Sequence, residues 1–76
     1  MPSLRPIPYA RFEKFLQRIG CRLIRERGDH RAWIREGMNR PVIVRRVKDL
    51  PIFEIKSNLR TLGIATEQYL EMIGKD

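Results

Sequence analysis

Three short strand-like segments follow one another between residues 21 and 45, and they constrain the fold more than any other feature. They read CRLIRER (21–27), HRAWIRE (30–36) and RPVIV (40–44). Turn residues separate them at Gly28-Asp29 and at Gly37-Met38-Asn39, which predicts two hairpins and an antiparallel meander. In the first strand, Cys21 and Leu23 should share one face, with Arg22 and Glu26 on the other.

Apolar residues at helical spacing flank these strands on both sides. A first stripe consists of Tyr9, Phe12, Phe15, Leu16 and Ile19, followed by Gly20. A second consists of Ile52, Ile55, Leu59 and Leu62, preceded by Pro51 and followed by Gly63. The first pattern predicts a helix that ends at Gly20, and the second a helix with Pro51 as its first residue. Thr66 should cap a last helix that carries Tyr69, Leu70 and Ile73.

The predicted order is therefore α-β-β-β-α-α, an α+β fold in one domain spanning residues 1–76. Three short strands cannot cover both faces of their own sheet, so the helices should pack on one face and leave the other for solvent or a ligand. The chain holds one cysteine and one histidine, which excludes an internal disulfide and a structural zinc site. We expect no metal and no cofactor.

The net charge of the chain indicates the class of partner that it binds. Sixteen Lys and Arg residues oppose nine Asp and Glu residues, giving a net charge of +7, and most of the cations are arginine, whose planar fork suits phosphate. Nucleic acid is the expected partner, and a solvated basic surface without a ligand is the simpler alternative. No basic amphipathic helix separate from the core pattern and no long apolar run is present, so we expect a cytoplasmic protein that does not bind membranes.

His30 is the main candidate for chemistry, because the sequence has no phosphate-binding glycine loop, cysteine pair or His-x-x-x-His motif. An imidazole can exchange a proton near neutral pH, and such catalysis contributes about 10²- to 10⁴-fold. RNA cleavage would suit it, since the 2′-hydroxyl is a built-in nucleophile that needs no metal. Candidate phosphate-binding residues are Arg25, Arg27, Arg31 and Arg45 near the strands, and Lys56 and Arg60 on the second helix.

Each of these assignments has a structural alternative. His30 could be an ordinary turn residue, and Asp29 is more simply a turn-forming aspartate than a partner of the imidazole. Trp33 is expected in the core rather than stacked on a base, and Phe53 could cover the hydrophobic edge of its helix. Lys56 and Arg60 could simply be solvated. A metal-dependent nuclease would instead use carboxylates from Glu26, Asp29, Glu36 and Asp49, which are scattered along the chain.

Two segments resemble the HicA (YcfA-like) family of toxin ribonucleases from prokaryotic toxin–antitoxin pairs. They are the corner Gly28-Asp29-His30, which opens the second strand, and the tail from Lys48 to Ile64, which reads KDLPIFEIKSNLRTLGI. Together with the first helix ending in RIG, the likeness runs from about Tyr9 to Ile73. It implies a fold like that of the double-stranded RNA-binding domain.

The resemblance also implies a function. It matches His30 to the family's catalytic histidine and Gly28 to its turn glycine. It also implies messenger RNA as the substrate and a HicB antitoxin as the partner. We expect the antitoxin to have an acidic contact surface. The chain departs from the family pattern at two positions. Asp29 stands where many members have Ser, and Arg45 stands where many have a second His. Asp29 either hinders the site by repelling phosphate or tunes the imidazole. The alternative function is a non-catalytic RNA-binding module, or an inactive relative, within an antitoxin complex.

Overall fold

The computed structural model describes residues 3–75. Its elements are α1 (Tyr9–Arg18), β1 (Arg22–Arg27), β2 (His30–Ile34), β3 (Val42–Arg45), α2 (Ile52–Leu62) and α3 (Thr66–Ile73). The strands form one antiparallel sheet in the order β1-β2-β3. The α-β-β-β-α-α order and the α+β class are as predicted.

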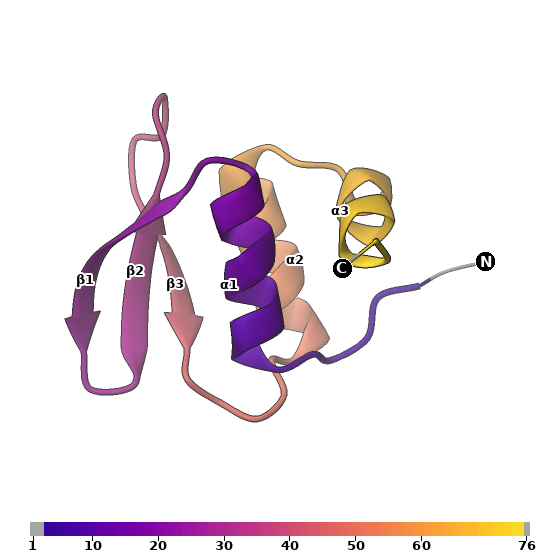
Figure 1. Ribbon diagram of the computed structural model, residues 1–76, viewed down its shortest axis with the longest axis horizontal. Coiled ribbons are helices and arrows are strands. Elements are labelled where there is room, and N and C mark those ends of the chain that lie inside the picture. The colour runs from indigo at the N-terminus through magenta and orange to yellow at the C-terminus, as the bar shows by residue number, and fades with distance from the viewer. Residues whose placement is uncertain (1–2, 76) are drawn as a thin grey trace.

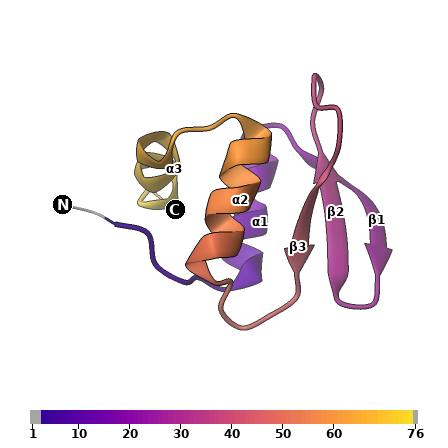
Figure 2. The same cartoon turned by 180° about the vertical axis from the view of Figure 1, so that it is seen from behind.

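The elements form three layers, which Figures 1 and 2 show from opposite sides. The sheet is the first layer, α1 and α2 form the second, and α3 packs on α1 and α2 on the side away from the sheet. Because α3 lies in this outer layer, only α1 and α2 cover the sheet. No helix within residues 3–75 is long and apolar enough to cross a membrane.

The hydrophobic core lies between the sheet and the helices. Trp33, Val42 and Val44 are at most 3% exposed and belong to the same cluster as the aromatic residues of α1 and α3. Side chains alternate along a strand, so His30 and Ile43 project from the opposite, uncovered face. The prediction of a free sheet face is thus confirmed, as is the core position of Trp33.

The expected faces of the first strand are partly wrong. Leu23 pairs with Trp33 and Glu26 pairs with Arg31, so Glu26 shares the face of Leu23 and not that of Arg22. Every residue of β1 is exposed, including Leu23 at 39% and Ile24 at 45%, although Cys21 just before the strand is buried. Two features explain this exposure and the change of face. The strand lies at the sheet edge farthest from the helices (Figure 1), and its register shifts between Leu23 and Arg25, which disturbs the alternation.

The helix starts differ from the prediction by one residue. Pro51 and Ala65 are the extended N-cap residues, so α2 begins at Ile52 and Thr66 is the first residue of α3 rather than its cap. Phe53 is 71% exposed and does not cover the edge of α2, because it lies outside the buried stripe of that helix. At the other end of α2, Gly63 takes a φ of 72°, the left-handed conformation that glycine tolerates best.

Candidate functional site

The site is built on the tight turn between β1 and β2. Only Gly28 and Asp29 lie between the strands, and Gly28 has a φ of 59°, a conformation that suits glycine at the start of a two-residue hairpin turn. The amide of Arg46, just after β3, donates a hydrogen bond of 2.7 Å to the carbonyl oxygen of Asp29. This bond ties the turn to the third strand and fixes where His30 begins β2.

His30 is accessible, and Asp29 orients it. The His30 side chain is 57% exposed, and its Nδ1 lies 2.9 Å from Oδ1 of Asp29. Asp29 thus lies in the turn, as expected, and its carboxylate also contacts the imidazole, which was the less favoured of the two roles considered for it. Neighbouring residues of a strand point to opposite faces, but Asp29 lies in the turn, where this alternation does not keep it from His30. Within the described residues, Nε2 of His30 makes no hydrogen bond, so it is the ring nitrogen available to a ligand.

A shallow hollow lies beside the imidazole on the uncovered face of the sheet. It has a volume of about 210 Å³ and is lined by Arg25, Arg27, His30, Ala32 and Ile43, which we call the His30 hollow. The strand register explains this grouping, since Arg27 pairs with His30, and Ala32 pairs with Arg25 on one side and Ile43 on the other. Cross-strand partners project from the same face, so two arginines flank one imidazole.

The arginines of the sheet fall into two groups. Within the described residues, Arg25 and Arg27 make no ion pair, so their guanidinium groups are available to a ligand. Arg31 lies on the helix-covered face, where its Nε is 2.6 Å from Oε2 of Glu13 and its Nη1 is 3.0 Å from Oε2 of Glu26. These contacts, chiefly the hydrogen bond to Glu13, raise the pKa of Arg31. The structure thus places Arg31 away from the His30 hollow.

Glu13 is the important residue that the sequence analysis missed. It is 7% exposed, and its Oε2 also accepts a hydrogen bond of 2.9 Å from Nε1 of Trp33. Glu13 lies four residues after Tyr9 and three before Leu16, within the apolar stripe of α1. A carboxylate in such a stripe signals a buried polar contact, although it does not identify the partner.

Arg45 on β3 is the cross-strand partner of His30, but its side chain is held in an ion pair with Glu54. The two residues are directly paired between β2 and β3, but the guanidinium of Arg45 forms a two-pronged ion pair with the carboxylate of Glu54 on α2, with Nε 2.9 Å from Oε1. This ion pair raises the pKa of Arg45. Arg45 is therefore held at the edge of the site.

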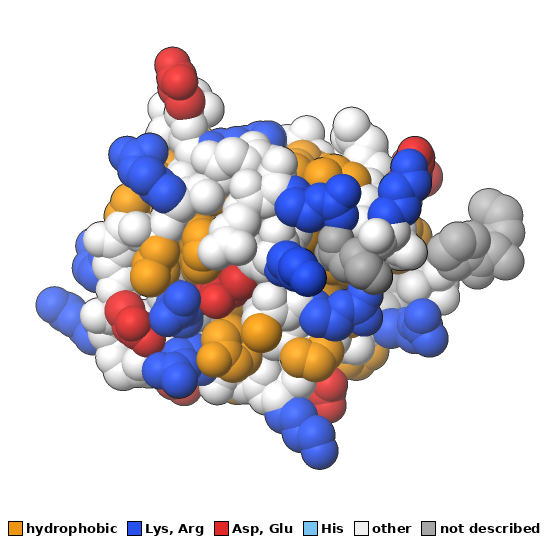
Figure 3. All heavy atoms as spheres, in the orientation of Figure 1, with side chains coloured by type: hydrophobic (Ala, Val, Ile, Leu, Met, Phe, Trp, Pro, Cys, Tyr) orange, Lys and Arg blue, Asp and Glu red, His pale blue; other side chains and the backbone are white. Residues whose placement is uncertain are grey.

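The remaining predicted residues are not brought to His30. Lys56 and Arg60 line a separate hollow beside α2 with Leu59 and Ile64. Lys and Arg side chains are spread over the face of the molecule shown in Figure 3 rather than gathered into one stripe. Residues 3–75 contain no group of three or more His, Cys, Asp or Glu side chains arranged to hold a metal ion, so the carboxylates of the metal-dependent alternative do not converge.

Comparison with known proteins gives one result. The sequence model of a family described as the HicA toxin of bacterial toxin–antitoxin systems matches residues 9–64, which include the His30 hollow, β3 and α2. No match was found among curated proteins or among solved structures.

Proposed function

Because the chain belongs to the HicA toxin family of bacterial toxin–antitoxin pairs, we propose that it is a metal-independent endoribonuclease that cleaves messenger RNA in the cytoplasm at the His30 hollow. The observation that carries this proposal is an exposed imidazole, oriented by a carboxylate and flanked by two arginines without ion pairs. General acid–base chemistry on a phosphodiester needs both kinds of group in one place.

The first step is proton removal by His30. With Nδ1 donating its hydrogen to Asp29, Nε2 carries the free lone pair and accepts the proton of the ribose 2′-hydroxyl. The 2′-oxygen then attacks the adjacent phosphorus, and the bond from phosphorus to the 5′-oxygen breaks. The leaving oxygen takes a proton from a water molecule, and the hydroxide left behind takes back the proton held on Nε2, which restores the base. The products are a 2′,3′-cyclic phosphate and a 5′-hydroxyl end.

Arg25 and Arg27 stabilise the charge that develops on the phosphate oxygens. Both arginines lie on β1, and His30 lies on the neighbouring strand β2. The scissile phosphate would therefore lie between the two guanidinium groups and the imidazole. Ala32 also lines the hollow, and its small side chain would leave the ribose room to approach. Lys56, Arg60 and Arg45 are proposed to contact RNA outside this hollow.

The antitoxin partner follows from the family. We infer a HicB-type antitoxin that covers the open sheet face with an acidic surface, because unpaired arginines there would attract it over a distance. Its association rate constant should fall as ionic strength rises. A rate constant independent of salt would contradict this electrostatic contact.

The alternative is an RNA-binding subunit without catalysis, and one observation favours it. The position facing His30 holds Arg45, so no second imidazole is available to protonate the leaving oxygen. Such a module would bind RNA with a salt-dependent affinity and yield no cleavage products.

The test uses the purified protein, EDTA and a short RNA. We expect cleavage with 2′,3′-cyclic phosphate ends, and no cleavage of the matched oligonucleotide that carries 2′-deoxyribose at the cut position. Cleavage of that 2′-deoxy control would overturn the proposed mechanism. Binding without cleavage of either strand would favour the RNA-binding module.

A further inference from the structure

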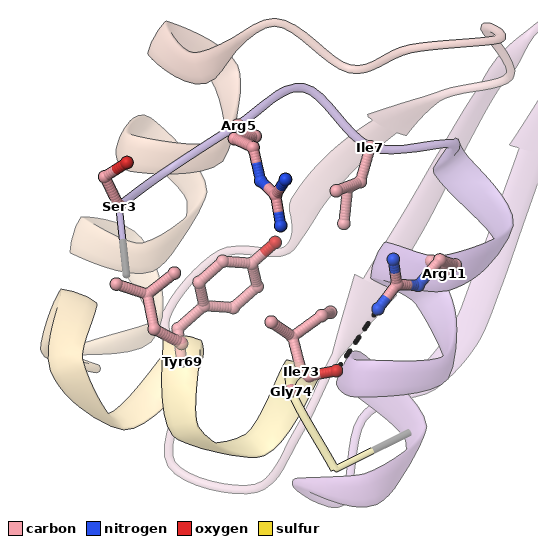
Figure 4. A pocket seen from close by; sticks show the side chains of 8 residues that line it. Ser3, Arg5, Ile7, Arg11, Tyr69, Ile73 and Gly74 are labelled. Carbon is pink, nitrogen blue, oxygen red and sulfur yellow. Dashed lines mark hydrogen bonds between the residues drawn. The ribbon is translucent and has the colours of Figure 1, made fainter. Parts of the chain in front are cut away.

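A further pocket lies on the side of the molecule away from the sheet, between the N-terminal segment, α1 and α3. It has a volume of about 460 Å³, and its polar side chains include Arg5, Arg11 and Tyr69. Figure 4 shows these three side chains arriving from three different parts of the chain, with Ile7 and Ile73 between them. We call it the N-terminal pocket.

Tyr69 has an unsatisfied polar group there. The residue is 2% exposed, and its hydroxyl has no hydrogen-bond partner within the described residues. Its ring is fixed by an edge-to-face contact with Phe15 at a centroid distance of 4.9 Å. In Figure 4 the ring holds the hydroxyl toward the guanidinium of Arg5. Buried hydroxyl groups normally have partners, so an unpaired one aimed into a pocket indicates a ligand.

The two arginines supply the charge. Within residues 3–75, Arg5 has no ion pair or hydrogen bond, and the Arg11 side chain makes a single hydrogen bond, from Nη2 to the carbonyl oxygen of Ile73 at 3.2 Å. Burial raises the pKa of Tyr69 to about 12, so the phenol is a neutral hydrogen-bond donor at physiological pH. The pocket thus presents donors from three directions and two positive charges.

We propose that the N-terminal pocket binds the phosphate group of a phosphate monoester. A phosphate monoester dianion has three terminal oxygens and two negative charges, which match three donor groups and two arginines, whereas a carboxylate could be held by one arginine alone. The adjoining Ile7, Leu70 and Ile73 offer an apolar wall to the organic part of the ligand. This site is separate from the His30 hollow and does not depend on ribonuclease activity.

Titration of the full chain with 5′-AMP and inorganic phosphate, followed by amide chemical shifts, tests the proposal. Adenosine is the uncharged control. We expect saturable binding of both phosphates with shifts centred on Arg5, Arg11 and Tyr69, and no saturable binding of adenosine there. Affinity should weaken as pH falls below the second pKa of phosphate, about 6, because the dianion is lost. Absence of saturation, or equal binding of adenosine, would overturn the proposal.

Two variants sharpen the test. Arg5→Ala and Tyr69→Phe should each weaken 5′-AMP binding by at least about tenfold, because each removes a hydrogen bond to a charged group. Arg40→Ala, which removes one exposed positive charge from the loop between β2 and β3, should leave the affinity unchanged. Equal losses in Arg40→Ala and Arg5→Ala would mean that net charge alone attracts the ligand, which contradicts a built site.

Two further measurements serve as controls, one for folding and one for the His30 hollow. Tyr69→Phe keeps the ring contacts and should not lower the melting temperature; a clear decrease would show that the hydroxyl has a partner within the protein and would overturn the proposal. His30→Ala should bind 5′-AMP like the unmodified chain, which separates this site from the proposed nuclease. A short RNA with a 5′-phosphate, compared with the same RNA carrying a 5′-hydroxyl, shows whether the bound group belongs to an RNA end or to a free metabolite.

Discussion

The carboxylate of Asp29 lies 2.9 Å from Nδ1 of His30, and this contact engages one of the two ring nitrogens. The resemblance described in the sequence analysis matches Asp29 to a position where many members of the family have serine. Both a carboxylate and a hydroxyl can accept a hydrogen bond from Nδ1, so the change keeps the orientation while adding a negative charge near the phosphate.

Asp29→Asn should therefore slow RNA cleavage by about tenfold or more, because the amide can donate to Nδ1 and put the proton on Nε2. Asp29→Ser, which keeps an acceptor, should retain much more activity. Single-turnover cleavage rates at saturating protein check this pair. Equal rates for Asp29→Asn and the unmodified chain would show that Asp29 does not orient the imidazole.

Arg25 and Arg27 are expected to hold phosphate, whereas Arg40 lies elsewhere. Arg25→Ala and Arg27→Ala should each weaken RNA binding and reduce the slope of log affinity against log salt by about 0.7, the contribution of one phosphate contact on single-stranded RNA. Fluorescence anisotropy over a series of salt concentrations measures the slope. An Arg40→Ala control with the same reduction would argue against a specific role for the His30 hollow.

Glu13 contributes to stability rather than to chemistry. Its removal in Glu13→Ala leaves Arg31 and Trp33 without their shared acceptor, and we expect a loss of about 3 kcal/mol in the free energy of unfolding. Glu36→Ala, in an exposed loop, should change that energy by less than about 0.5 kcal/mol. Urea denaturation compares the two variants. A negligible effect of Glu13→Ala would mean that this buried network does not stabilise the fold.

Ionisation of Tyr69 should make the free energy of unfolding depend on pH in the alkaline range. Burial raises its pKa from an ordinary value of 10.0 to about 12. Between these values the unfolded chain has lost the phenolic proton while the folded chain keeps it, so Tyr69 makes the free energy of unfolding fall as pH rises from about 10 to about 12. Tyr69→Phe should show a smaller fall over this range in urea denaturation. Parallel curves for the two proteins would contradict the expected burial effect.

Local patterns predicted most of the fold. The spacing of apolar residues located three helices, and the glycine turn at Gly28-Asp29 located the hairpin, because these signals depend on neighbours within one or two turns of chain. Local sequence patterns could not predict the side-chain contacts between elements that are distant in the sequence. The pairing of Arg31 with Glu13 joins residues 18 positions apart, and it depends on how α1 crosses the sheet.

The candidate site was only partly predictable for the same reason. His30 could be chosen because it is the single imidazole, but its neighbours depend on the strand register. That register places Arg25 and Arg27 beside it, turns Arg31 to the opposite face, and brings Arg45 within reach of Glu54. The N-terminal pocket had no sequence signal, since Arg5 and Tyr69 are 64 positions apart in the chain.

The most direct test of the ribonuclease proposal is the single-turnover rate of RNA cleavage by His30→Ala in EDTA, measured at protein concentrations that saturate RNA binding. The proposal predicts that the variant binds RNA with the affinity and salt dependence of the unmodified chain, while its cleavage rate falls by about 10²- to 10⁴-fold. An unchanged cleavage rate would remove His30 from the mechanism and contradict the account.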